Sequence, residues 1–255
     1  MSANIKSKYL REFIKEIQYQ NRNPQNIKIL ELLDDLSTNP EKLIFKGTKL
    51  YRSRVITDLK KINKTPNFFG YDADNSFIPP VKFTRDMRAN YRYIPYLYCA
   101  SDSYTALVEV RPRLGSSVSI ATIVANEDLN LLDFTMQKKP GKMTEAKQNL
   151  FFDLSILYST PVTDDDNILD YIPTQYIAEY AKNLGYDGII FTSSLTPERN
   201  QYSFDFFNAV IFKYEKCSVL KSNVFLITNN YVDCEQIDND IEKLQIKSNM
   251  LRIKD

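Results

Sequence analysis

RANYRYIPYLYCASDSYTALVEVRP, residues 88–112, is the stretch of sequence that decides the fold. Its centre, Ile94–Ala100, is a short apolar run with the aromatic and β-branched content of a strand. Ser101 or Asp102 can then cap a helix that continues through Ala106 to Val110. The stretch therefore predicts a strand that is followed at once by a short helix.

On the C-terminal side of residues 88–112, the sequence predicts further strands and helices. Ser117–Ala125 alternates like a half-buried strand. Two segments with helical patterns follow, Lys142–Tyr158 and Tyr171–Leu184, and Gly185 fits a helix C-terminal stop. The other predicted elements are strands at LNLLDF (129–134), DGIIFTS (187–193), FFNAVIFKY (206–214) and 219–227, and then a charged, partly helical tail.

On its N-terminal side, the first forty residues predict two helices, since apolar residues recur at helical spacing from Tyr9 to Ile17 and from Ile27 to Leu36. Leu50–Ile56 predicts a strand rich in β-forming residues. From 63 to 90 the periodicity is lost among Asn, Asp, Pro and aromatic residues, which indicates a long ordered loop with a function. Because no repeat or low-complexity linker interrupts the chain, we expect no second independent domain.

The composition excludes several classes of protein. The 255 residues are 43% hydrophobic, enough for one sizeable core, and 33 basic against 32 acidic residues leave a formal charge of +1. A dedicated nucleic-acid binder is not expected at this charge. The charged N-terminus lacks the apolar run of a signal peptide and no membrane span is evident, so we expect a cytoplasmic protein.

The chain contains no histidine. This removes the nucleophile pairs, general bases and metal ligands that depend on histidine, and the three cysteines show no CxxC spacing, so we expect no metal site. The six glycines form neither GxGxxG nor a P-loop. Chemistry must therefore use carboxylates, hydroxyls, tyrosines and arginines.

Four blocks of the sequence together resemble the RES domain family: LYRSRV (50–55), residues 88–112, PTQYIAEYAKNLGYDGIIFTSS (173–194) and FNAVIF (207–212). The resemblance implies an α+β fold similar to ADP-ribosyltransferases, with a split, mainly antiparallel sheet, flanking helices and an N-terminal helical extension. It implies three segments: an extension at 1–45, a RES domain at 46–221, and a C-terminal strand and charged tail at 222–255. Met87 and Tyr91-Arg92-Tyr93 depart from the family, which usually has a glycine before the loop arginine and Pro-x-Gly after it.

The resemblance also implies the site residues. Glu109 and Arg52 match the catalytic positions, and the NAD-binding positions match Arg88, Tyr98, Ser193, Ser194 and Asn208, with Ser193 favoured over Ser194. The residue types suit the chemistry. A carboxylate can stabilise an oxocarbenium-like ribose, arginines hold a diphosphate in bidentate fashion, and an aromatic face can stack on the nicotinamide cation.

The function that the resemblance implies is that of a toxin that degrades NAD by cleaving the nicotinamide–ribose bond, through hydrolysis or phosphorolysis. Alternatives are an ADP-ribosyltransferase that modifies a protein, and a catalytically silent partner-binding module. NAD is the substrate, no further cofactor is expected, a cognate antitoxin protein is the expected partner, and homo-oligomer formation is left open. Taken alone, Glu109 could instead pair with Arg111 or Arg113, and Tyr98 could be a core tyrosine with its hydroxyl bonded.

Overall fold

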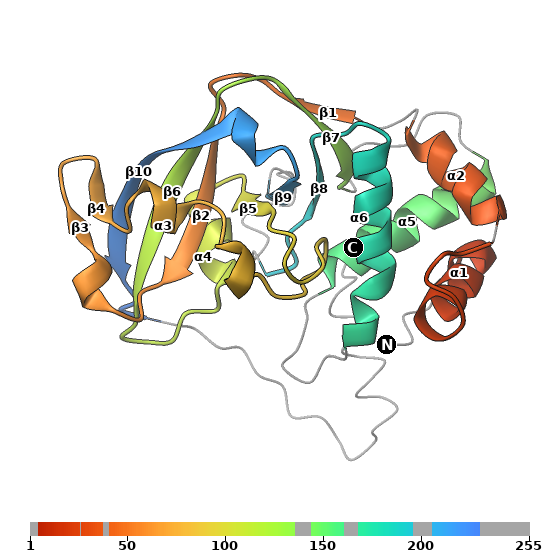
Figure 1. Cartoon of the computed structure of the whole chain (residues 1–255), viewed down its shortest axis with the longest axis horizontal. Coiled ribbons are helices and arrows are strands. Elements are labelled where there is room, and N and C mark those ends of the chain that lie inside the picture. The colour runs from red at the N-terminus through yellow and green to blue at the C-terminus, as the bar shows by residue number, and fades with distance from the viewer. Residues whose placement is uncertain are drawn as a thin grey trace, which may run out of the picture.

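A computed structural model describes residues 5–25, 27–37, 41–135, 144–160, 168–195 and 206–229 (Figure 1). Its helices are α1 (Lys8–Tyr19), α2 (Ile27–Ser37), α3 (Ala73–Ser76), α4 (Ser103–Glu109), α5 (Glu145–Ser159) and α6 (Ile172–Asn183). Its strands are β1 (Glu41–Ile44), β2 (Lys49–Val55), β3 (Asn63–Lys64), β4 (Phe68–Gly70), β5 (Leu97–Ala100), β6 (Ser117–Ala125), β7 (Leu129–Phe134), β8 (Gly188–Thr192), β9 (Phe207–Ile211) and β10 (Cys217–Leu226).

The strands form one sheet in the order β1-β7-β8-β9-β5-β2-β6-β10-β4-β3. The neighbours β7 and β8 and the neighbours β10 and β4 are parallel, and the other neighbouring pairs are antiparallel. In the middle of the sheet, β2 and β5 share the single residue pair Tyr51 and Ala100, whereas β2 pairs with β6 along its whole length. The expected α+β fold with a split, mainly antiparallel sheet is confirmed.

Helices α1, α2, α5 and α6 lie on the β7–β8 side of the sheet, whereas α3 and α4 pack mainly on the half that contains β2, β6 and β10 (Figure 1). α5 and α6 pack on β8, and α1 and α2 pack in turn on α6 and α5. The fully buried side chains of Leu10, Phe13 and Ile17 from α1 belong to the same apolar cluster as Leu154 and Tyr158 from α5. The N-terminal helices are therefore part of the core, and whether a domain boundary falls near residue 45 stays a prediction.

The entry into α1 is held by polar contacts as well. The backbone N–H groups of Lys6 and Ser7 donate to the buried Asp153 carboxylate at 3.1 and 2.6 Å. The longest described helix, α5, has 15 residues, fewer than the roughly 20 that a bilayer span requires, so no described helix could cross a membrane.

Most predicted elements are present, but the expectation of a long loop at 63–90 is wrong. The segment contains β3 and β4, which extend the sheet beyond β10, and α3, which packs on β10. β4 pairs with Ser222 and Asn223. Gly70 permits this close packing, because a Cβ there would lie 2.6 Å from Ser119 Oγ and 2.9 Å from Ser222 Oγ. Strands of two and three residues are too short to show a periodic pattern.

Two other differences are smaller. The strand predicted at Ile94–Ala100 begins only at Leu97, and β1, which pairs with β7, was not predicted. The predicted tail beyond residue 229, with Cys234, lies outside the described residues.

Candidate active site

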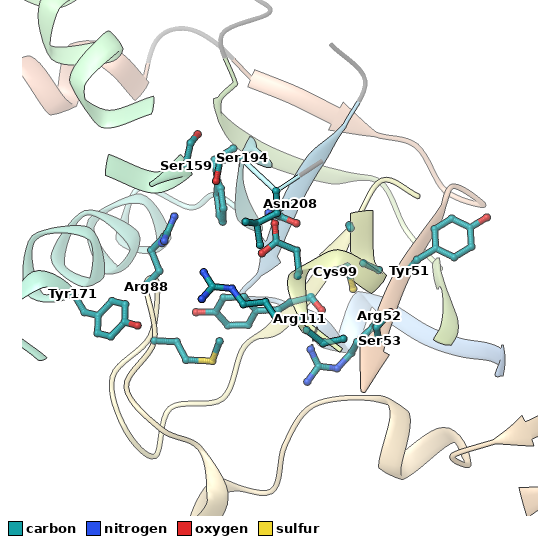
Figure 2. Close-up of a pocket in the computed structure, with 18 residues that line it drawn as sticks. Tyr51, Arg52, Ser53, Arg88, Cys99, Arg111, Ser159, Tyr171, Ser194 and Asn208 are labelled. Carbon is teal, nitrogen blue, oxygen red and sulfur yellow. Dashed lines mark hydrogen bonds between the residues drawn. The ribbon is translucent and has the colours of Figure 1, made fainter. Parts of the chain in front are cut away.

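A cavity of about 400 Å³ lies where the two halves of the sheet separate (Figure 2). Its walls include residues of β2 from one half and of β5 and β9 from the other. The predicted site residues that line it are Arg52, Arg88, Tyr98, Glu109, Ser194 and Asn208. The seventh, Ser193, is buried and contacts Glu109 instead. The structure thus brings all seven together from four separate blocks of sequence.

Glu109 is the last residue of α4, and its carboxylate is held by two donors. Ser193 Oγ donates to Glu109 Oε1 at 2.8 Å and Asn208 Nδ2 donates to the same oxygen at 2.7 Å. The helix is fixed at its other end by Asp102, whose carboxylate accepts the N–H groups of Tyr104 and Thr105, both at 2.9 Å. The exposed Glu109 side chain is therefore oriented by the ends of β8 and β9 while remaining open to a ligand.

Glu109 is not held in place by an ion pair with a described residue. Among the described residues, no lysine or arginine lies within ion-pair distance of its carboxylate, including Arg111 and Arg113. The interpretation as a helix carboxylate paired with a following arginine is not supported. The described residues also hold no group of three or more Cys, Asp or Glu side chains placed to bind a metal ion.

Arg52 crosses the gap between the two halves of the sheet. Its Nη1 donates to the Tyr98 carbonyl at 2.9 Å, from β2 to β5. Burial lowers the pKa of the Arg52 guanidinium, and no described residue accepts a hydrogen bond from its buried Nε. A half-buried cation on a cavity wall whose buried Nε lacks a described partner is poorly compensated by the protein alone, so an anionic ligand would stabilise it.

Arg88 enters the cavity from the loop before β5. One guanidinium nitrogen donates to the Thr160 carbonyl, and the guanidinium carbon lies 5.8 Å from the centre of the Phe191 ring. Burial lowers the pKa of Arg88, and the negative charge of Glu109 opposes this shift. Arg88 is therefore anchored at its tip by α5 and β8, as a ligand-binding arginine on a loop needs to be.

Tyr98 was predicted either as a core tyrosine with a bonded hydroxyl or as an aromatic face for the ligand, and the structure has features of both. Its hydroxyl donates to Asn90 Oδ1 at 2.8 Å and accepts the Ala89 N–H at 3.1 Å, so it is bonded inside the protein. Burial raises the pKa of Tyr98 well above its ordinary value, so the hydroxyl keeps the proton that it donates. The residue nevertheless lines the cavity, and it fixes the loop that carries Arg88.

Buried contacts also hold this loop from the side of α6. Gln175 Nε2 donates to the carbonyls of Met87 and Asn90 at 3.0 and 2.9 Å. Tyr93 has a φ of 71°, in the left-handed region that favours glycine. It stands where the family that the sequence resembles has the glycine of Pro-x-Gly, so the loop adopts a glycine-like turn without glycine.

Sequence reasoning missed Arg111 as a cavity residue. Arg111 lines the cavity immediately after α4, with a φ of 44°. Figure 2 shows its side chain and that of Arg88 reaching into the cavity from opposite sides. The residue types gave no signal for this left-handed backbone, because the proline that follows favours an extended conformation at Arg111. The other missed lining residues with polar side chains include Ser159, the last residue of α5, and Tyr171, which precedes α6.

Comparison with known proteins identifies a family. The family model described as "RES domain" matches residues 62–223, more than half of the chain. Arg52 precedes the matched residues, and the other six predicted site residues lie within them. No curated protein sequence matches the chain.

Three chains of solved structures match the fold. One belongs to the crystal structure of the MbcT–MbcA toxin–antitoxin complex of M. tuberculosis. It is 14% identical in sequence, the match covers 78% of this chain and 92% of that chain, and the TM-score is 0.43.

Proposed function

The chain belongs to the RES domain family, and on this premise we propose that it is a toxin that consumes NAD by cleaving the bond between nicotinamide and ribose. The observation that carries the proposal is the Glu109 carboxylate, which is held by Ser193 and Asn208 at the wall of a cavity. The same cavity is lined by Arg52, Arg88 and Arg111. Carboxylate and guanidinium groups are what this reaction requires.

The chemistry of the cleaved C1′–N bond between ribose and nicotinamide explains why the site needs a carboxylate. When the C1′–N bond breaks, its electron pair leaves with the nicotinamide ring and neutralises the positive ring nitrogen. Positive charge then develops on the ribose at C1′ and its ring oxygen. A carboxylate fixed in advance stabilises this charge more than it stabilises the ground state, and such an interaction accelerates the reaction. Glu109 is the cavity carboxylate in a position to do so.

The arginines explain how the substrate is held. Three guanidinium groups and one carboxylate give the lining a charge of about +2, which matches the two negative charges of a dinucleotide diphosphate. Tyr98 lines the cavity, so its ring can stack on the flat nicotinamide cation. Water or phosphate then forms a new C1′–O bond, and an attacking water releases one proton to the solvent.

The test is to incubate the purified protein with NAD, with and without phosphate, and to identify the products by mass spectrometry. Free nicotinamide with ADP-ribose indicates hydrolysis, and nicotinamide with phosphorylated ADP-ribose indicates phosphorolysis. Transfer of ADP-ribose to added bacterial proteins would favour the transferase alternative. Unchanged NAD with folded protein would contradict the proposal and leave the silent binding module. A cognate antitoxin that holds the enzyme inactive is the partner that a cytoplasmic toxin of this kind requires.

A further inference from the structure

A second cavity, of about 390 Å³, lies beside the first. The two share the lining residues Ser53 of β2 and Val110, which caps the C-terminal end of α4. None of the seven residues implied by the resemblance lines this second cavity. A ligand that fills the first cavity can therefore continue past the end of α4 into the second without leaving the protein surface.

The second cavity is cationic. Arg54 and Lys61 line it, and of the described residues in its walls none carries a negative charge. Arg54 is partly tied to the protein, because its Nη2 donates to the Phe77 carbonyl at 3.1 Å. Burial and then the positive charge of Arg52 lower the pKa of Arg54 to about 10. An anion placed between the two arginines would offset both effects.

The strand geometry links the two arginines. Residues two apart on a strand lie on the same face, so Arg52 and Arg54 project to one side of β2 at a spacing of roughly 7 Å. Ser53 lies between them in sequence, and its buried side chain points to the opposite face of β2. A ligand that contacts both arginines must carry anionic groups a short distance apart, as a diphosphate does.

We propose that the second cavity binds the adenosine monophosphate half of the dinucleotide whose nicotinamide end lies beside Glu109. The inference rests on the proposed function, which sets the diphosphate against the arginines of the first cavity, and adds the position of the adenosine beyond it. Arg54 and Lys61 contact the adenylate phosphate, and Val55, Tyr71 and Val110 provide the apolar lining that a purine requires.

The test compares NAD with nicotinamide mononucleotide, which has the same scissile bond but lacks the adenylate half. Lys61→Gln should raise KM for NAD about threefold to fivefold, the size expected of one exposed charged contact, with kcat unchanged. Cleavage of the mononucleotide should not change. The double variant Arg54→Gln/Lys61→Gln should raise KM for NAD more than about tenfold.

Lys60→Gln is the matched control, because Lys60 is the exposed neighbour of Lys61 in the short helix Leu59–Lys61 and does not line the cavity. If Lys61→Gln raised KM equally for NAD and for nicotinamide mononucleotide, the second cavity would be acting as a site for free phosphate. That result would overturn the inference. An unchanged KM for NAD in the double variant would also overturn it.

If the protein cleaves neither NAD nor nicotinamide mononucleotide, that result counts against the proposed function alone. The second site is then tested by ligand binding. Calorimetry with adenosine monophosphate should then show binding to the unsubstituted protein and weaker binding to Lys61→Gln. The absence of any binding would refute the second site.

Discussion

Replacing Ser193 by alanine tests whether the orientation of Glu109 matters for the reaction. Ser193 Oγ donates to Glu109 Oε1 at 2.8 Å, and Asn208 donates to the same oxygen. A hydrogen bond to a charged group contributes about 1.5–3 kcal/mol. Because Glu109 is exposed to solvent and Asn208 retains its bond, we expect the lower end of this range, a loss of about tenfold in rate.

The assay is the release of nicotinamide, with kcat and KM measured separately. Ser193→Ala should lower kcat about tenfold and leave KM nearly unchanged, because the residue positions the carboxylate and does not hold the phosphates. Ser194→Ala is the matched control, since Ser194 lines the cavity and makes no described hydrogen bond to Glu109. Thermal melting should show that both variants fold. Equal kcat values for the two alanine variants would refute the positioning role of Ser193.

Three further predictions concern binding and stability. Arg111→Gln should raise KM for NAD about fivefold to tenfold, whereas Arg113→Gln, outside the cavity lining, should not; equal KM values would remove Arg111 from the site. Deleting residues 1–37 should leave an insoluble or non-cooperatively melting product, because each buried leucine or phenylalanine lost from the core contributes about 1.5–3 kcal/mol; a soluble fragment with a sharp melting transition would contradict this. Burial alone would raise the pKa of Asp187, but hydrogen bonds from Lys213, the Asn130 N–H and Lys216 outweigh it and hold the pKa below its ordinary value. The ionised Asp187 therefore stabilises the folded state above the unfolded pKa of about 3.9, and this stabilisation is lost as the pH falls through the lower pKa of the folded state. Asp187→Asn should lower Tm by at least about 2 °C at pH 7 and by progressively less in acid.

The sequence predicted the parts of the fold that depend on local signals. The strand at β5, the cap at Ser101 or Asp102 and the helix α4 follow one another in the chain, so the order of elements around Glu109 could be predicted, although the strand begins three residues later than expected. β1, β3 and β4 could not, because their two to four residues show no periodic pattern, and β1 and β4 form where the distant strands β7 and β10 supply hydrogen bonds. Gly70 became interpretable only once Ser119 and Ser222 were seen beside it.

At the site, too, the residue types could be predicted from the sequence, but the features that depend on tertiary contacts could not. Motif resemblance identified Arg52, Glu109 and Asn208 and favoured Ser193 over Ser194. Which of two adjacent serines faces inward depends on how the strand ends, so the sequence alone could not decide it. The structure separates them, because Ser193 is buried against Glu109 and Ser194 is exposed on the cavity wall. Arg111 was considered only as an ion-pair partner, and its left-handed backbone was not evident from residue type.

The most direct test of the central claim is the NAD turnover of Glu109→Gln. Glutamine keeps the shape of the side chain and one acceptor oxygen for Ser193 or Asn208, but it removes the charge that faces the developing ribosyl cation. Removing one preorganised electrostatic group lowers rates on the order of a hundredfold to a thousandfold. We expect that loss in kcat, with NAD affinity by calorimetry and the thermal melt close to those of the unsubstituted protein. A folded Glu109→Gln protein that cleaves NAD within about tenfold of the unsubstituted rate would show that another group carries the reaction.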